Sequence, residues 1–150
     1  MSWLDDITRE KRDRKEADDA INALAIDRRD QYRSKVKEFW AELCDRLLSA
    51  LEHYNDNVPT ECGVVCESLL GGTRLIINAG SPPPRSLTVQ FNFEAQRISC
   101  YQMMPEKSER HFRLSVGRDG TLSMAEDPVH QAVPSGNEEE TILKSFLRAL

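Results

Sequence analysis

Large apolar side chains between residues 32 and 54 recur every three or four positions along the chain. They form the series Tyr32, Val36, Phe39, Trp40, Leu43, Leu47, Leu51 and Tyr54. This spacing brings the side chains onto one face of a helix, where burial of each large one contributes roughly 1.5–3 kcal/mol. Neither glycine nor proline occurs before Pro59, so nothing earlier in the chain interrupts a helix. The pattern predicts a helix that belongs to the core.

The first 26 residues have a sparser apolar pattern and many charges. Their apolar positions are Trp3, Leu4, Ile7, Ala17, Ile21 and Leu24. Residues 9–19 carry five bases and five acids, a balance that is typical of a solvated helix with surface salt bridges. A single helix over 2–54 would be about 80 Å long, so it either bends near Asp27–Asp30 or projects and finds a partner. We therefore predict a charged helical extension, 1–26, and a single α+β domain, 27–150.

Beyond Pro59 the apolar period changes from 3.6 to 2, which is the spacing of strands. The clearest alternation places Leu87, Val89, Phe91 and Phe93 on one face, and a second places Phe112, Leu114 and Val116 there. Further strands are predicted near 62–70, 73–79, 97–103 and 121–125, and Pro128–Gly136 is predicted to be a loop. Short turns such as Gly71-Gly72 favour antiparallel pairing, because parallel strands need long crossover connections. The pattern predicts an antiparallel meander of about six strands.

A last apolar series predicts a C-terminal helix, made by Ile142, Leu143, Phe146, Leu147 and Leu150. Three glutamates lie in its first turn and two bases follow later, as the helix dipole favours. The whole order indicates an α+β fold: a long or bent N-terminal helix, the antiparallel meander sheet, and a C-terminal helix packed on one sheet face.

Charge and composition limit the classes of partner. The net charge is −5 in 150 residues, whereas nucleic acids and anionic membranes attract clustered positive charge. No stretch approaches the roughly 20 apolar residues of a membrane helix. Asp5 and Asp6 stand where a signal peptide would carry bases. We expect no nucleic-acid partner, no membrane partner and a cytoplasmic protein.

The cysteines do not have the spacing of a metal site. They are Cys44, Cys62, Cys66 and Cys100. A zinc knuckle needs a two-residue gap, and Cys62 and Cys66 are separated by three residues. In a reducing compartment such residues pack as small hydrophobic thiols. We expect no metal and no cofactor.

No catalytic motif occurs: there is no phosphate loop, no nucleophile elbow and no His-Glu-x-x-His. The polar face of the predicted sheet is the best place for a ligand. Tyr101, His111 and Arg113 could share that face and supply an acid, a base and an anion contact. The alternative is a solvated outer face with no ligand. We assign no catalytic residue.

Trp3, Leu4 and Ile7 are apolar residues in a terminus that otherwise looks solvated. They either pack back onto their own domain or form a partner-binding or dimerising helix end, since aromatic anchors are enriched at interfaces. The charge-balanced helix and the absence of catalytic motifs favour a non-enzymatic protein-interaction module, a homo-oligomer or an adaptor. The alternative is a small-molecule binding protein or an enzyme with a pocket between the sheet and the helices.

Overall fold

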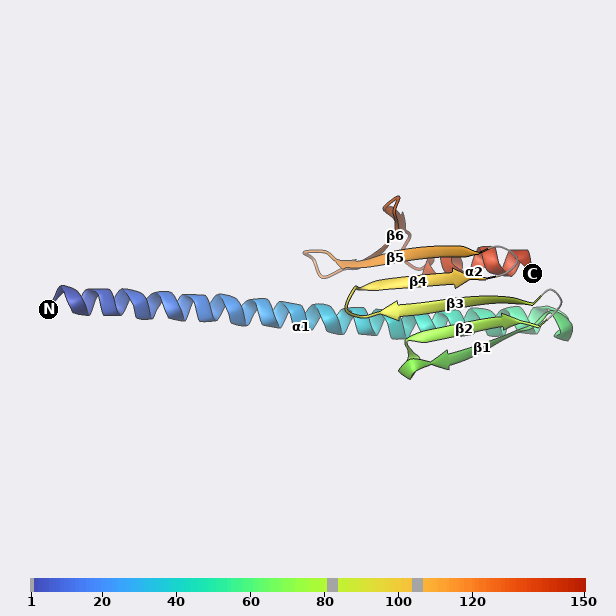
Figure 1. The fold of residues 1–150 in the computed structure, drawn as a ribbon, viewed down its shortest axis with the longest axis horizontal. Helices are drawn as coiled ribbons and strands as arrows, with labels where there is room; N and C mark the ends of the chain where they lie inside the picture. The colour runs from blue at the N-terminus through green and yellow to red at the C-terminus, as the bar shows by residue number, and fades with distance from the viewer. Residues whose placement is uncertain (1, 81–83, 104–106) are drawn as a thin grey trace. The chain divides into compact units, whose positions relative to one another are not determined.

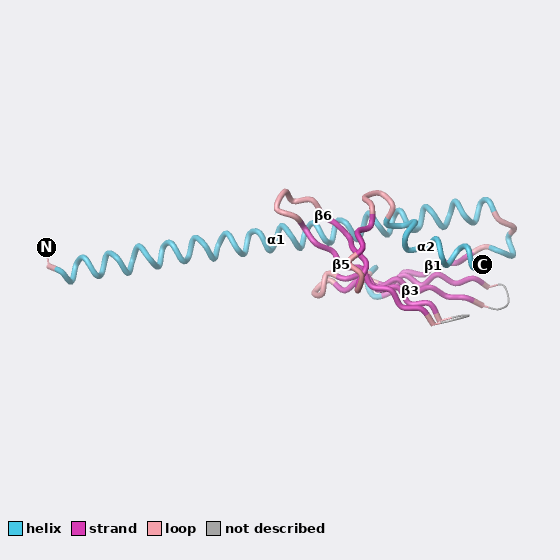
Figure 2. The backbone as a smooth tube through the Cα atoms, turned by 90° about the horizontal axis from the view of Figure 1, so that it is seen from above, coloured by secondary structure: helices cyan, strands magenta, loops and turns pink. Residues whose placement is uncertain are grey.

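The chain folds as α+β, with a long helix, a meander sheet and a closing helix (Figures 1 and 2). The computed structural model describes residues 2–80, 84–103 and 107–150. The helices are α1 (Trp3–Asn57) and α2 (Glu138–Ala149), with short 3-10 turns η1 (Thr60–Cys62) and η2 (Leu70–Gly72). The strands are β1 (Val64–Leu69), β2 (Arg74–Ala79), β3 (Arg85–Asn92), β4 (Arg97–Gln102), β5 (Ser108–Val116), β6 (Leu122–Asp127) and β7 (Gln131–Val133).

The chain divides into two compact units, and the boundary lies between Lys35 and Val36, inside α1. In the first unit every described residue from 2 to 31 is exposed, and the helix runs through Asp27–Asp30 without a break. The bend that the sequence allowed there is absent. The sequence analysis divided the chain into an extension, 1–26, and a domain, 27–150. That division says which part folds on its own, and it stays a prediction.

The sheet of the second unit is an antiparallel meander in which each strand pairs with the next along the chain, from β1 to β7. The predicted topology is confirmed, but the described part of the chain has seven strands and not about six. The additional strand is β7, in the segment predicted to be a loop. It is three residues long and pairs only with β6, through Met124↔Val133, Ala125↔Ala132 and Glu126↔Gln131. An edge strand of three residues is too short to show the alternation of apolar and polar residues from which the other strands are predicted.

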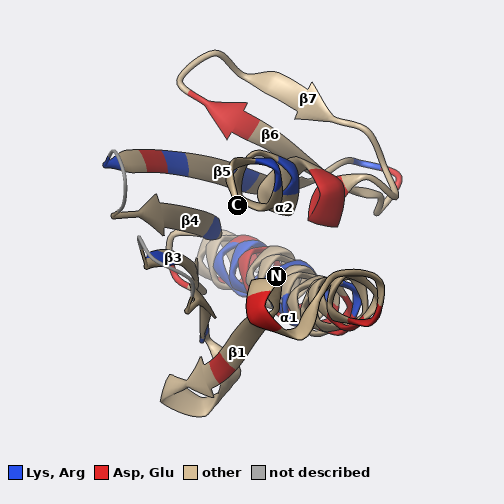
Figure 3. Cartoon of the chain, turned by 90° about the vertical axis from the view of Figure 1, so that its right-hand side faces the viewer, with Lys and Arg blue, Asp and Glu red and all other residues tan. Residues whose placement is uncertain are grey.

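The core lies between one face of the sheet and the two helices. Figures 2 and 3 show α2 and the later part of α1 on the same side of the curved sheet. The buried helix residues are Val36, Trp40, Leu43, Leu47 and Leu51 of α1 and Ile142, Leu143 and Phe146 of α2. They meet alternate strand residues, including Ile77, Val89, Ile98, Phe112 and Leu114. The predicted apolar stripe of the core helix and the predicted packing of the C-terminal helix are confirmed.

Trp40 joins α1 to the middle of the sheet. Its ring stacks on Phe91 with centroids 5.1 Å apart and an interplanar angle of 12°. The indole N–H also donates a hydrogen bond of 2.9 Å to the carbonyl oxygen of Gly72. Gly72 has a φ of 88°, in the left-handed region that favours glycine. One side chain therefore fixes both the helix-to-sheet packing and the turn between β1 and β2.

Asn55 of α1 forms hydrogen bonds with the backbone of the edge strand β1. Its amide donates to the carbonyl of Val64 at 2.9 Å and accepts from the N–H of Val64 at 2.8 Å. These are the bonds that a neighbouring strand would make. The side chain thus substitutes for a strand at the start of β1.

Among the described residues, none of the helices is both long and apolar enough to cross a membrane.

Candidate functional site

The strand register assembles a polar row on the face of the sheet away from the core. Ser99 of β4 stands opposite His111 of β5, and His111 stands opposite Asp127 of β6. The row continues to Gln90 and Arg74, which pair through β3 and β2. Along their strands these residues alternate with core residues such as Ile98, Cys100 and Phe112, so they belong to the outer face, although Ser99 is itself largely buried.

A chain of two hydrogen bonds crosses this row. His111 Nε2 lies 2.7 Å from Glu109 Oε1, and His111 Nδ1 lies 2.8 Å from Ser99 Oγ. A carboxylate only accepts, so Nε2 donates to Glu109, and the Nδ1 of a neutral ring accepts from the Ser99 hydroxyl. The ring of Tyr101 meets the imidazole edge-on, with centroids 6.1 Å apart.

Serine, imidazole and carboxylate in series are the parts of a hydrolase triad, but the surroundings lack the rest of the machinery. Ser99 is only 9% exposed and lies within β4. That strand is paired on both sides, with β3 and β5, so the ladders use its backbone N–H groups and leave no oxyanion donors. The chain is a satisfied polar network on a regular sheet.

The carboxylate of Asp127 lies close to the side chains of Arg97, Arg113 and His130. Its carboxylate oxygens lie 3.8 Å from Arg97 Nη2, 3.7 Å from Arg113 Nη2 and 3.5 Å from His130 Nδ1. Both oxygens are shielded from solvent and have no hydrogen-bond partner within the described chain. The carboxylate therefore attracts the two guanidinium groups at slightly more than hydrogen-bond distance, and it attracts His130 as a charge only when that ring is protonated. It fixes Arg113 beside the polar row.

The structure thus places all three predicted ligand residues on one face. Tyr101 and His111 are in contact, and Arg113 lies two residues further along β5 on the same side. That face is opposite the helices. A pocket between the sheet and the helices would use other residues, so these three fit the outer-face hypothesis and not the pocket one.

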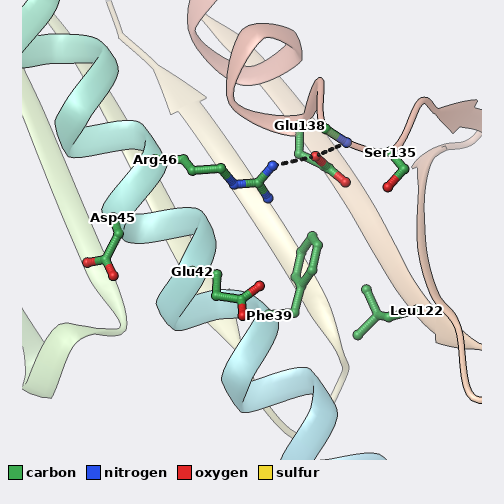
Figure 4. A pocket seen from close by; sticks show the side chains of 8 residues that line it. Phe39, Glu42, Asp45, Arg46, Leu122, Ser135 and Glu138 are labelled. Carbon is green, nitrogen blue, oxygen red and sulfur yellow. Dashed lines mark hydrogen bonds and ion pairs between the residues drawn. The ribbon is translucent and has the colours of Figure 1, made fainter.

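A cavity does lie beside the helices, with a volume of about 520 Å³ (Figure 4). Arg46 of α1 crosses it to contact Glu138 at 3.0 Å and Glu139 at 3.2 Å. Glu138 is buried and also accepts from the backbone N–H of Gly136 at 2.9 Å. The remaining lining residues are Phe39, Glu42, Asp45, Leu122 and Ser135.

The sequence predicts a pocket between the sheet and the helices only as an alternative, and it does not identify the residues that line this cavity as a site. The three glutamates of α2 were recognised only as a favourable first turn, which is a local signal. Nothing in the local sequence indicates that Arg46, from a helix some 90 residues earlier, forms ion pairs with two of them. Among the described residues no group of three His, Cys, Asp or Glu side chains is placed to hold a metal ion.

Three thiols of the second unit, Cys44, Cys66 and Cys100, are poor nucleophiles. Burial raises the pKa of Cys44 to about 11 and that of Cys100 to about 12, and it also raises the pKa of Cys66. A thiol with so high a pKa stays protonated near neutral pH and is unreactive. The packing role predicted for all four cysteines agrees with the environment of these three, but it is wrong for Cys62, which is exposed.

The first unit has a different kind of surface. Its large apolar side chains face solvent: Trp3 is 72% exposed, Leu4 56%, Ile7 40%, Ile21 64%, Leu24 59% and Ile26 61%. Lys, Arg, Asp and Glu are interspersed along the same helix, and both signs of charge are visible on α1 in the end-on view of Figure 3. We call residues 3–26 the exposed segment. Trp3, Leu4 and Ile7, the predicted partner-binding residues, lie at its first turns.

Comparison of the chain with protein-family models, with curated proteins and with solved structures finds no match.

Proposed function

We propose that this protein is a non-enzymatic protein-interaction module and that the exposed segment is its binding surface. The observation that carries the proposal is the exposure of six large apolar side chains in a helical stretch where no described residue is buried. Three of these side chains lie in the first turns of the exposed segment and three in its last turns, and exposed apolar groups clustered in this way mark interaction surfaces.

The energetics of the helix support the same conclusion. An isolated helix is marginal in water, and most helices in proteins are stabilised by burying an apolar face. In α1 that burial begins at Val36. A partner that covers Trp3, Ile7 and Ile21 would supply to the exposed segment what the sheet supplies to the later part of the helix.

The test is a triple variant of the full chain, Trp3→Ala, Leu4→Ala and Ile7→Ala. We expect it to lose association, measured as a lower sedimentation coefficient at high concentration or as loss of a crosslinked partner protein. The urea midpoint of the folded domain should stay the same, because these side chains are exposed. Val65→Ala on β1 is the matched control, since Val65 is also 64% exposed. Association that survives the triple variant would contradict the proposal.

A second candidate is a small-molecule site in the cavity beside Arg46. Its volume is within the usual range of ligand pockets, about 300–1,000 Å³. Three acids and one base line it, so a cationic ligand suits it better than an anionic one. Native mass spectrometry of the same samples separates the two proposals. A monomer with a bound small molecule favours the cavity, and a bare oligomer favours the exposed segment.

A further inference from the structure

We propose that the partner of the exposed segment is the same segment of a second copy, packed antiparallel so that Glu10 of each copy faces Arg14 of the other. This inference rests on the proposed function and specifies the partner and the register. It is carried by the order of apolar and charged side chains along one face of α1.

One face of the helix has the spacing of a coiled coil. Steps of four and three residues connect Trp3, Ile7, Glu10, Arg14, Ala17 and Ile21. In a continuous helix this alternation keeps the side chains on one seam. The seam is apolar at both ends and charged at its centre, where the acid precedes the base by one turn. All six residues are exposed in the single chain.

A parallel arrangement of two copies sets like residues opposite one another. Glu10 would then meet Glu10, and Arg14 would meet Arg14, at the centre of the seam. Both contacts are repulsive and partly desolvated. The sequence of the seam therefore disfavours a parallel pair.

An antiparallel pair centred between Glu10 and Arg14 matches all six of these positions. Each copy contributes the same contacts, so the pairing is self-complementary, as a two-fold interface requires. The contacts are Trp3 with Ile21, Ile7 with Ala17, and Glu10 with Arg14, each made twice. Apolar residues meet apolar residues and opposite charges meet at the centre.

Shifting this register by one heptad removes the match. In one direction Glu10 would lie against Ile21 and Arg14 against Ala17. In the other, Ile7 would lie against Glu10 and Trp3 against Arg14. Either shift buries a charge against an apolar side chain without a partner, which is costly. The charges therefore select one register as well as one direction.

The margins of the interface keep the association weak. Near the two-fold axis Lys11 of one copy approaches Lys11 of the other, and Asp13 approaches Asp13. These contacts bring like charges together, so they oppose the association, although only slightly because they lie at the solvated border. The seam itself is short and contains one alanine per copy. We expect a dimer that dissociates on dilution.

The test exchanges the two central charges in the full chain, Glu10→Arg with Arg14→Glu. In the antiparallel register the exchanged chain pairs with itself as well as the original does. A mixed dimer of original and exchanged chains, by contrast, sets Glu against Glu and Arg against Arg. Like charges opposed across an interface are costly, so with one chain isotope-labelled, native mass spectrometry should show mixed dimers about tenfold below the statistical half.

The matched control is the exchange Arg12→Glu with Glu16→Arg, which reverses a pair of the same spacing away from the seam. It should form mixed dimers with the original chain at the statistical proportion. Enrichment of mixed dimers by the central exchange would mean a parallel pair, and statistical mixing would mean that these charges lie outside the interface. Either result overturns the proposal.

A chain that stays monomeric at high concentration also overturns it, because a second copy is then not the partner. The interaction function is judged separately by the triple variant at Trp3, Leu4 and Ile7. If that variant loses a different crosslinked protein, the exposed segment is a binding surface for another partner. If it loses nothing, the proposed function itself fails.

Discussion

Single polar side chains complete the fold at positions where the backbone alone leaves groups unpaired. Asn55 satisfies both edge groups of Val64, and Trp40 satisfies the carbonyl of Gly72. Each of these hydrogen bonds joins residues that are far apart in the sequence, so the apolar periodicity of a helix or a strand cannot predict it. Removing such a side chain leaves a backbone group without a partner, and that costs more than the net value of the bond.

Asn55→Ala should lower the free energy of unfolding by about 1–3 kcal/mol, because both backbone groups of Val64 lose their partner at once. Urea denaturation measures the change. Asn57→Ala is the control: its amide donates only to the carbonyl of His53 at an exposed site, so its effect should stay within about 0.5 kcal/mol. Equal effects of the two substitutions would show that Asn55 does not cap the sheet edge.

Arg110 and Glu126 form a bidentate ion pair between β5 and β6. Arg110 Nε and Nη2 donate to the two oxygens of Glu126 at 2.8 and 3.0 Å, and Nη1 donates to the carbonyl of Thr141 in α2 at 2.9 Å. Hydrogen bonding from Arg110 lowers the pKa of Glu126 below its ordinary value of 4.5. The same bond raises the pKa of Arg110. The pair ties β5, β6 and α2 together.

Glu126→Gln should therefore remove a pH-dependent part of the stability. A carboxyl whose pKa is lowered on folding stabilises the native state above its unfolded pKa, and this contribution is lost as the pH falls through the folded value. The variant should be less stable by about 1–2 kcal/mol at pH 7, and the difference should shrink below pH 4.5. Urea midpoints across pH 3–7 test this. Glu140→Gln, in an exposed pair with Lys144, should show almost no difference.

At the scale of elements, α1 is one continuous helix whose two parts are stabilised by different interactions. From Val36 onward its apolar face is buried against the sheet. Before that, the exposed segment depends on helix propensity and on charge pairs along its own surface, each worth about 0.2–0.5 kcal/mol. Its helicity should therefore respond to whatever covers its apolar residues.

Trp3 can report on this directly, because the chain has two tryptophans and the other, Trp40, is buried. Trp40→Phe keeps an aromatic ring to stack on Phe91 and leaves Trp3 as the single indole. In dilute solution its emission should be that of a water-exposed indole. It should shift to shorter wavelength as the concentration rises and the segment pairs. An emission maximum that is independent of concentration would show that Trp3 stays solvated.

The elements themselves follow closely from local pattern. The period-2 runs predicted the strands, the Gly71-Gly72 turn predicted the first hairpin, and the terminal apolar series predicted α2. The strand β7 was missed because three residues on an edge need no apolar face, and only their pairing with β6 defines them. Local sequence therefore predicts the elements that bury something and misses the one that buries little.

At the scale of the whole molecule, the two units have different surfaces. The domain from Val36 onward buries its apolar residues, and the outer face of its sheet carries the network around His111 and Asp127. The first unit exposes its apolar residues. The triple variant at Trp3, Leu4 and Ile7 is informative for this reason: it should change association while the domain unfolds as before. A change in the unfolding midpoint would mean that these residues stabilise the domain.

The amino-acid sequence by itself determined the fold class, the meander and the two helices, because apolar periodicity is a local property that each segment carries. It also placed Tyr101, His111 and Arg113 on one polar face by strand alternation. Only the tertiary structure decided that His111 lies between Ser99 and Glu109, that Asp127 joins the same row, and that Arg46 meets Glu138. These contacts depend on the register between strands and on the packing of distant helices. Hydrogen bonds and ion pairs form only after burial has brought such positions together.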